Sequence, residues 1–328
     1  MRAGLRWYTL PMSSLSPARL VDAVLEGTVV GSFTKIGPSV RRRLDKWQPL
    51  ARLDGKTVVV TGATSGLGRA ASIELAHLGA TVEVVGRDEQ RAADVVAEIA
   101  GSSSSTGTPK ATARIGDMSS LSGVRALADQ LASTHDHLHA VVHCAWAMFE
   151  QRRETGDGIE ATWATMVVGP HLLTRLLAER TERAVWVSSG GMYTQRVELD
   201  DIEWQWRKWS GSKAYAQAKR AQVDLVAEAT ERGEAPQQYA MHPGWAATPG
   251  VETSLPGFDK VMGPLLRDPA DGADTMVWLV AAPSGELTAG GFFHDRRLRN
   301  TVRWPGTGTS APDRDRLRTL VDRQAKLG

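Results

Sequence analysis

A short β-branched run that leads directly into a glycine-rich turn is the feature that most constrains the fold of this chain. Residues 57–61 read Thr-Val-Val-Val-Thr, and residues 62–68 read Gly-Ala-Thr-Ser-Gly-Leu-Gly before a stretch with helical spacing of apolar residues. A glycine at 62 permits a tight turn, and a glycine at 66 lets the backbone approach a pyrophosphate. The order of strand, turn and helix therefore predicts a nucleotide phosphate site formed by Gly62, Thr64, Ser65, Gly66, Leu67 and Gly68.

The alternation of short apolar runs with longer amphipathic stretches continues along most of the chain. The expected strands are 57–61, 81–85, 111–115, 140–145, 184–188, 238–242 and 291–294. The expected helices are 68–78, 88–100, 121–132, 158–179 and 212–231. Repeated βαβ units of this kind form mainly parallel sheets. The pattern predicts an α/β fold of the Rossmann type, a doubly wound parallel sheet of about seven strands in three α/β/α layers.

The chain has no internal repeat and no second glycine-rich phosphate loop, so we expect one Rossmann-fold catalytic domain over residues 53–300. Residues 1–52 form an N-terminal extension with an expected helix over 17–26 and a basic run, Arg41 to Arg43. Residues 301–328 form a C-terminal tail with an expected helix over 311–327. Its apolar positions Leu317, Leu320 and Val321 are spaced to dock on the core.

Composition excludes several classes of partner. The 39 basic and 37 acidic residues nearly balance, which gives no global attraction to nucleic acid. The single cysteine excludes an intramolecular disulfide and a cysteine metal cluster, and it fits a reducing compartment. No apolar run reaches the roughly 18 residues of a membrane span, and no secretory signal is apparent. We therefore expect a cytoplasmic protein without a metal, in which residues 1–45 make weak peripheral contact with anionic membranes.

A second motif carries the chemistry. Tyr215-Ala216-Gln217-Ala218-Lys219 falls on an expected helix, where the i, i+4 spacing places the phenol and the ammonium on one face. A phenol with a pKa near 10 is a poor proton-transfer group at neutral pH, but a nearby cation favours the phenolate. Ser189 stands at the end of the fifth expected strand. Ser189 is a candidate for the same site; the alternative is a structural role, in which its hydroxyl caps the turn at the strand end.

The spacing of these motifs resembles the short-chain dehydrogenase/reductase family. The segments 33–35, 188–192, 215–220, 241–251, 272–279 and 292–296 look closest to its dehydrogenase/reductase member 12 branch. The resemblance implies hydride transfer between a nicotinamide and a carbonyl or alcohol substrate. Catalysis is then expected from Ser189, Tyr215 and Lys219. The expected cofactor contacts outside the glycine turn are Arg87, Asp117, Met118, Ala145, Tyr215, Lys219, Pro243, Gly244 and Thr248. A helix cap is the other role open to Asp117.

The end of the second strand indicates which dinucleotide is used. Relatives that prefer NAD place a carboxylate for the ribose hydroxyl there, whereas this chain has Gly86 followed by Arg87. A cation at this place favours a 2′-phosphate, so we expect NADP(H). Asp88 is placed either to pair with Arg87 or to oppose the phosphate, and Arg69 is a candidate second cation.

Some positions depart from the family pattern. His143-Cys144-Ala145-Trp146 stands where the family usually has Asn-Asn-Ala-Gly, and Met166 replaces an asparagine that relays protons. Two outcomes are open: a slower or rebuilt relay that uses His143, or a catalytically weak protein that binds nucleotide as a scaffold or sensor. The intact Ser189, Tyr215 and Lys219 favour the enzyme.

An insert before Tyr215 bears on the substrate. It contains Tyr193, Trp204, Trp206 and Trp209, which indicates a bulky apolar carbonyl or alcohol such as a lipid, steroid-like or isoprenoid compound. The alternative is that these rings pack the insert onto its own domain. The sequence leaves open whether the protein forms a homo-oligomer.

Overall fold

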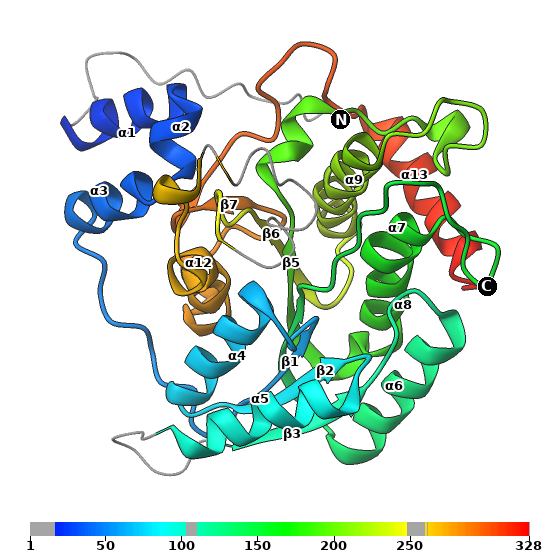
Figure 1. Ribbon diagram of the computed structural model, residues 1–328, viewed down its shortest axis with the longest axis horizontal. Helices are drawn as coiled ribbons and strands as arrows, with labels where there is room; N and C mark the ends of the chain where they lie inside the picture. Colours follow the sequence, from blue (N-terminus) through cyan, green and yellow to red (C-terminus); the bar gives the residue numbers. More distant parts are fainter. Residues whose placement is uncertain (1–16, 103–109, 248–259, 261, 328) are drawn as a thin grey trace.

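The structure of the chain, a computed structural model, describes residues 17–102, 110–247, 260 and 262–327. A sheet of eight strands runs through its centre in the order β3-β2-β1-β4-β5-β6-β7-β8 (Figure 1). Neighbouring strands are parallel up to β7, and β7 and β8 are antiparallel. The strands are β1 Thr57–Thr61, β2 Thr81–Gly86, β3 Lys110–Ile115, β4 Leu138–His143, β5 Thr181–Val187, β6 Gln237–Met241, β7 Phe292–His294 and β8 Arg297–Leu298. The predicted Rossmann-type sheet is confirmed, with one strand more than expected.

The additional strand, β8, is the second half of a hairpin. Asp295 and Arg296 form its two-residue turn with φ of 49° and 56°. Positive φ at both turn positions usually calls for glycine or asparagine, and the strand is only two residues long. Because residues 295 and 296 are neither glycine nor asparagine, the sequence contains no pattern that predicts this hairpin turn. The Asp295 side chain is buried and ion-paired to Arg41 and Arg267, which fixes the turn from outside the hairpin.

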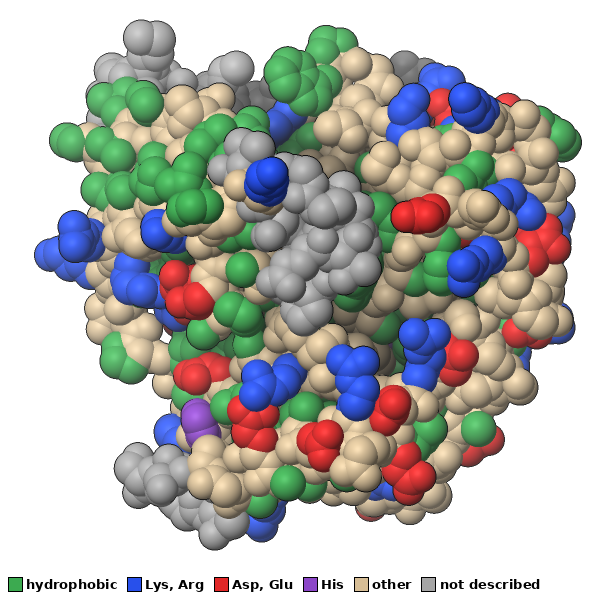
Figure 2. Space-filling model, in the orientation of Figure 1, with side chains coloured by type: hydrophobic (Ala, Val, Ile, Leu, Met, Phe, Trp, Pro, Cys, Tyr) green, Lys and Arg blue, Asp and Glu red, His purple; other side chains and the backbone are tan. Residues whose placement is uncertain are grey.

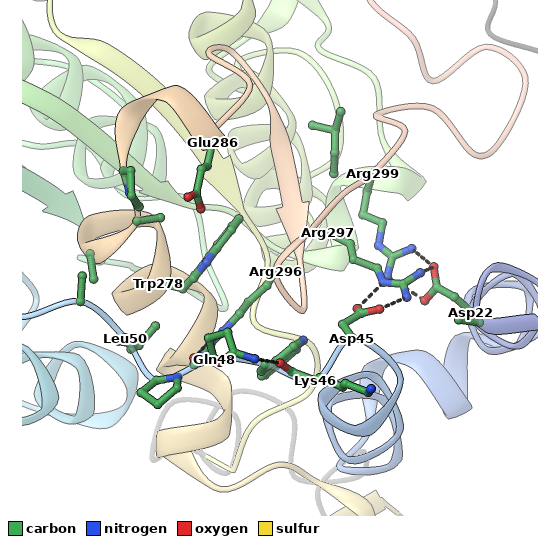
Figure 3. Close-up of a pocket in the computed structure, with 18 of the residues that line it drawn as sticks. Asp22, Asp45, Lys46, Gln48, Leu50, Trp278, Glu286, Arg296, Arg297 and Arg299 are labelled. Carbon is green, nitrogen blue, oxygen red and sulfur yellow. Dashed lines mark hydrogen bonds and ion pairs between the residues drawn. The ribbon is translucent and has the colours of Figure 1, made fainter. Parts of the chain in front are cut away.

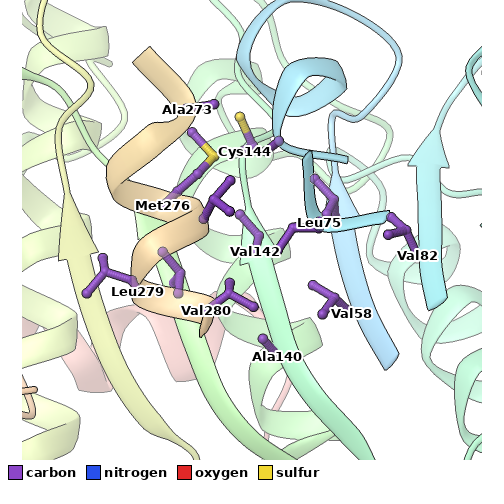
Figure 4. Close-up of a cluster of buried hydrophobic side chains, with 14 of the residues drawn as sticks. Val58, Leu75, Val82, Ala140, Val142, Cys144, Ala273, Met276, Leu279 and Val280 are labelled. Carbon is purple, nitrogen blue, oxygen red and sulfur yellow. The ribbon is translucent and has the colours of Figure 1, made fainter. Parts of the chain in front are cut away.

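Helices cover both faces of the sheet. One face carries α4 (Gly66–His77), α5 (Glu89–Gly101) and α12 (Pro269–Ala281), and the other carries α6 (Leu121–Thr134), α8 (Gly169–Leu176) and α9 (Gly211–Glu231). Successive strand residues alternate between the two cores, since side chains of a strand point to opposite faces. Val58 and Val142 thus pack against Leu75 of α4 and Met276 of α12 (Figure 4).

The expected long helix over 158–179 is interrupted. It begins as α7 (Ala161–Trp163), continues as a π-helical turn over residues 164–168 and ends as α8. Glu160 caps its start by accepting hydrogen bonds from the N–H groups of Thr162 and Trp163. A π turn leaves a carbonyl without its usual helical partner. Here the Gln222 side chain of α9 donates to the Met166 carbonyl at 2.7 Å.

The first three helices and the last helix of the described residues pack on this framework from opposite sides (Figure 1). The N-terminal end forms α1 (Pro17–Gly27), α2 (Val29–Phe33) and α3 (Ile36–Leu44), and the Phe33 ring joins a core cluster with Trp186 and Phe292. The C-terminal helix α13 (Ala311–Gln324) buries Leu317 and Val321 as predicted, while Leu320 is only partly buried. None of the helices in the described parts of the chain is long and apolar enough to cross a lipid bilayer.

The expectation that Arg41, Arg42 and Arg43 act together as a basic surface run is wrong. The Arg41 side chain is fully buried and forms ion pairs with Asp22, Glu26 and Asp295. A buried arginine keeps its charge only with such partners, and all three carboxylates come from other elements.

Candidate active site

A cleft of about 550 Å³ opens at the carboxyl ends of β1, β4, β5 and β6. This is the edge at which doubly wound sheets bind their ligands. The glycine turn, Ser189, Tyr215 and Lys219 all line it. Its walls are residues 62, 65–68, 144, 146, 148, 187–189, 191, 194–195, 212–213, 215–216, 219 and 243–246. The structure therefore brings the predicted phosphate turn and the three predicted catalytic residues into one cavity.

The glycine turn is packed too closely for larger residues. Gly62 has a φ of 67°, and a Cβ there would lie 2.7 Å from the Ala145 Cα. A Cβ on Gly68 would lie 2.3 Å from the Gly62 carbonyl oxygen. Helix α4 starts after Ser65 without a side-chain cap, so its first N–H groups stay available to an anion in the cleft. Thr64 lies on the other side of the turn, against Gly86.

Ser189 ends the loop after β5 and starts a short 3₁₀ helix over Gly190–Thr194. Its hydroxyl accepts a hydrogen bond from the Gly191 N–H at 3.2 Å. The same hydroxyl is hydrogen-bonded to the Tyr215 phenol, which tends to lower the pKa of that phenol. The structural role of Ser189 as a turn cap is thus confirmed, and its hydroxyl also contacts the Tyr215 phenol, while its part in catalysis stays a prediction.

Helix α9 presents Tyr215 and Lys219 to the cleft on one face, as the spacing predicted. The Lys219 Nζ lies 5.6 Å from the centre of the Tyr215 ring and donates to the Val187 carbonyl at 2.6 Å. Burial lowers the pKa of Lys219 to about 8, so the ammonium persists at neutral pH. Burial also raises the pKa of Tyr215, and this effect outweighs the Ser189 hydrogen bond. The Tyr215 phenol is therefore protonated at neutral pH.

The positively charged group expected to choose the dinucleotide is exposed. Arg87 has no side-chain partner among the residues that the structure describes. Asp88 does not pair with it, because its carboxylate accepts the N–H of Arg91 and caps α5. Arg69 is paired with Glu98 and is not a free second cation.

Close packing explains why a glycine stands at position 86. A Cβ at this position would meet the Thr64 methyl group at 2.3 Å. The missing carboxylate at the end of β2 is therefore tied to the packing of the phosphate turn. Contact with Thr64 also places Arg87 beside that turn.

Three further expected cofactor contacts, Asp117, Met118 and Ala145, do not line the cleft. Asp117 accepts hydrogen bonds from the N–H and hydroxyl of Ser119 at 2.9 and 2.8 Å. The cap of α6 is Ser120 instead, so the alternative role of Asp117 as that cap is wrong. Met118 is buried against the helix α8 side, and the Ala145 N–H donates to the Thr61 hydroxyl at 3.3 Å.

Pro243 and Gly244 line the cleft directly after β6. The predicted contact at Thr248 lies outside the described residues. His242 is a packed strand-end residue: its ring stacks on His294 with 3.8 Å between centroids, and burial holds its pKa well below the usual range.

The expected relay through His143 is wrong. The His143 ring turns away from the cleft into the core, where Nε2 hydrogen-bonds Thr174 at 2.7 Å. Burial lowers its pKa to about 3, so it stays neutral. Its neighbour Cys144 lines the cleft instead, and burial raises the pKa of that thiol to about 11. Trp146 stands at the mouth of the cleft, 41% exposed, and Met166 is buried.

The aromatic insert packs on its own domain, so the alternative reading of it holds. Trp204 is buried against Trp209, and Trp209 donates to the Phe149 carbonyl at 3.2 Å. Trp206 points to solvent, and the Tyr193 hydroxyl donates to the Asn300 carbonyl. None of the four lines the cleft, so the expectation that they border the substrate is wrong.

The apolar walls of the cleft come from residues that, apart from Leu67, were not among the predicted site residues. Leu67, Trp146, Met148, Val187 and Trp245 supply them. Trp146 and Trp245 each follow a strand that leads to the cleft, which is the signal that could have identified them. Met148 carries no such signal, because its loop position depends on packing.

A second cavity lies far from this chemistry. It has a volume of about 950 Å³ and lies between α1, residues 45–51, the end of α12 and the β7–β8 hairpin (Figure 3). Arg297 and Arg299 on its wall are bonded to Asp22 and Asp45. Its charged groups are thus largely neutralised by one another, and it holds none of the predicted site residues.

Several known proteins are similar to this chain in sequence or in fold. Residues 56–190 match a family described as short chain dehydrogenase. The chain is 35% identical over 282 residues to Dehydrogenase/reductase SDR family member 12 of Bos taurus, covering 84% of this chain and 88% of that protein. It is 31% identical over 308 residues to polyprenol dehydrogenase of Mus musculus, covering 86% and 88%. A solved structure of an uncharacterised protein from Mycobacterium paratuberculosis matches with a TM-score of 0.68 at 27% identity, covering 85% of this chain and 97% of that one.

Proposed function

The chain belongs to the short-chain dehydrogenase/reductase family, and from that premise we propose an NADP(H)-dependent oxidoreductase that acts on a carbonyl or alcohol group. The observation that carries the proposal is the single cleft that holds the glycine turn together with Ser189, Tyr215 and Lys219. The family is one of oxidoreductases that use a nicotinamide cofactor. The specific dinucleotide and the substrate are our inference.

The residues present fit such a cofactor. A Cβ would fill the cradle at Gly62 and Gly68, and the uncapped start of α4 offers N–H groups to a pyrophosphate. Pro243 and Gly244 are available to the nicotinamide end, and Lys219 to its ribose. When bound, the nicotinamide supplies or accepts the hydride.

The proton chemistry belongs to Tyr215. Burial keeps the phenol protonated at neutral pH, so in reduction its hydroxyl donates a proton to the substrate oxygen. The Ser189 hydroxyl holds the same oxygen. The Lys219 ammonium, close to the ring, stabilises the phenolate that remains.

NADP(H) is favoured over NAD(H) by the end of β2. Arg87 offers an exposed, unpaired guanidinium beside the phosphate turn, among the residues described, and Asp88 is occupied as a helix cap. A planar guanidinium suits a phosphate dianion.

A bulky apolar substrate is supported by the walls of the cleft. Trp146, Met148 and Trp245 surround the space in front of Tyr215. Polyprenol dehydrogenase, the relative that is 31% identical, carries in its name an apolar alcohol of this class.

One observation favours the alternative of a catalytically weak, nucleotide-binding scaffold. The Met166 carbonyl, at the position of the family's relay asparagine, is already bonded to Gln222. The methionine side chain has no amide group to pass on a proton, so proton exchange from Lys219 must take a route other than the family's asparagine relay.

The experiment is cofactor oxidation over a panel of hydrophobic ketones and aldehydes, with the wild type and Tyr215→Phe. We expect turnover by the wild type and a loss of about 100- to 10,000-fold in the variant, the usual contribution of a general acid. NADPH affinity should change by no more than a few fold, because the hydroxyl acts on the substrate. Equal activity of the two proteins would sink the assignment. NADPH binding without any turnover by the wild type would support the scaffold.

A further inference from the structure

Helix α1 lies on the molecule with its apolar face outward. Surface helices of soluble domains normally bury an apolar stripe. In α1 the inward residues are Asp22 and Glu26, one turn apart. Leu20, Val21 and Val24 point to solvent, and Val24 is 69% exposed.

Ion pairs hold this orientation. Asp22 is bonded to Arg41 and to Arg299, both at 2.7 Å (Figure 3 shows its carboxylate on Arg297 and Arg299). Glu26 is bonded to Arg41 at 2.9 Å and also to Arg303. Turning α1 over would bury its apolar face but strand these buried charges, so the apolar face stays outside.

The exposed apolar face extends beyond α1. Val30 of α2 and Ile36 of α3 are 47% and 42% exposed. We call Leu20, Val21, Val24, Val30 and Ile36 the N-terminal apolar patch. Figure 2 shows hydrophobic side chains gathered over this part of the molecule, at its upper left, with Lys and Arg side chains beside them. No other stretch of twenty residues in the described parts exposes as many large apolar side chains.

The exposed, unpaired charges of residues 17–44 have one sign. Asp22 and Glu26 are the only carboxylates in residues 17–44, and both face inward. Arg19, Lys35 and Arg43 are exposed and have no partner among the described residues. An outward surface that combines apolar side chains with cations and lacks acids is complementary to an anionic bilayer.

We propose that the N-terminal apolar patch docks the protein on the surface of an anionic lipid membrane. The apolar side chains insert at the boundary between headgroups and acyl chains, and the three cations lie among the headgroups. This differs from a basic run at 41–43, because Arg41 is used inside the protein.

The N-terminal apolar patch lies next to the cleft. Phe33 ends α2, and its carbonyl accepts the N–H of Trp245, which lines the cleft. Docking would therefore bring the cleft close to the bilayer, where apolar alcohols and ketones accumulate. The docking itself does not depend on the reaction, and it is measured without substrate.

The test is co-sedimentation of the full chain with phosphatidylcholine vesicles, with and without phosphatidylserine, at low and high salt. We expect binding to the phosphatidylserine vesicles at low salt and a decrease at high salt. Val24→Glu places a charge in the apolar interface and should weaken this binding about tenfold or more. Leu176→Glu, on α8, is the matched control and should bind like the wild type. Lys35→Glu with Arg43→Glu should remove the preference for phosphatidylserine.

Several results would overturn the proposal. They are absence of binding at low salt, equal binding by Val24→Glu and the wild type, and loss of binding on removal of residues 1–16 when Val24→Glu binds normally. A fourth is a wild-type dimer that Val24→Glu converts to monomer and that binds no vesicles, because a second copy would then occupy the patch. Thermal unfolding of each variant shows whether it is folded.

Discussion

Lys219 shows how a single residue of the site works against stability. Its side chain is 2% exposed, and burial lowers its pKa from 10.5 to about 8. Such a shift corresponds to about 3 kcal/mol of unfavourable free energy for holding the charged form inside. The unfolded chain binds more protons between pH 8 and 10.5, so this penalty is complete below pH 8 and fades as the pH rises.

We predict that Lys219→Met stabilises the cofactor-free protein at pH 7 while it removes turnover. The Val187 carbonyl loses its donor, which offsets part of the gain by about 1–3 kcal/mol. The net rise in Tm should be roughly 2–4 °C, and it should shrink as the pH is raised from 8 to 10. Differential scanning fluorimetry over this pH range is the measurement. A lower Tm at pH 7, or a difference that ignores pH, would contradict it.

Arg87 is the single residue that we propose selects the dinucleotide. Charge-assisted hydrogen bonds to a phosphate contribute about 1.5–3 kcal/mol, or roughly ten- to a hundredfold in affinity. We predict that Arg87→Leu weakens NADPH binding by about this factor and leaves NADH binding unchanged. Fluorescence titration with both dinucleotides measures it, and Arg323→Leu, an exposed arginine of α13, is the control. A parallel loss for NADH would refute the assignment. Gly86→Asp is unsuitable for this test, because its Cβ would collide with Thr64.

At the scale of elements, α2 supports the loops that form the cleft. The Phe33 ring lies on Gly190, next to Ser189, and a Cβ at Gly190 would come within 2.3 Å of that ring. Phe33 also packs edge-on against Trp245. The N-terminal helices therefore back both the loop after β5 and the loop after β6.

We predict that Gly190→Ala lowers the Tm by several degrees, because overpacking of a filled core costs about 1–3 kcal/mol. Gly191→Ala is the matched control, since its Cβ would find no atom closer than 3.5 Å. Its Tm should stay within about a degree, as expected when no clash arises. Scanning fluorimetry of both proteins decides between them. Equal Tm values would mean that Phe33 does not seal this loop.

At the scale of the whole molecule, one buried charge cluster joins helices α1 and α3 to the β7–β8 hairpin. Arg41 of α3 bonds Asp22 of α1 and Asp295 of the β7–β8 hairpin, and Asp295 also bonds Arg267. The arginine partners hold the pKa of Asp22 well below its usual range, against the opposing effect of burial. Its contribution to stability is therefore present above the unfolded pKa of about 3.9 and is lost only in stronger acid.

We predict that Arg41→Met destabilises the protein by about 3–5 kcal/mol, because the buried carboxylates of Asp22 and Asp295 each lose one arginine partner. Arg43→Met, two residues away on the exposed side, should change the free energy of unfolding by less than about 0.5 kcal/mol. Urea unfolding of both variants at pH 7 provides the comparison. A small effect of Arg41→Met would show that the cluster rearranges around other cations.

The sequence by itself determined the parts of this protein that depend on neighbours along the chain. The glycine turn, the strand pattern and the Tyr215–Lys219 face all follow from spacing within one or two elements, and the fold they predict is confirmed. A helix was also expected over residues 17–26, and α1 confirms it. Periodicity states which face of a helix is apolar, because that is a property of the helix alone.

Only the tertiary structure decided what each face meets. The inward turn of α1 depends on ion pairs between residues such as Asp22 and Arg299, which lie 277 positions apart. In the same way, His143 entered the core and the insert tryptophans stayed off the cleft because of packing between distant segments. Contacts of this range leave no local pattern in a single sequence, since each partner alone has the composition of an ordinary surface or core residue.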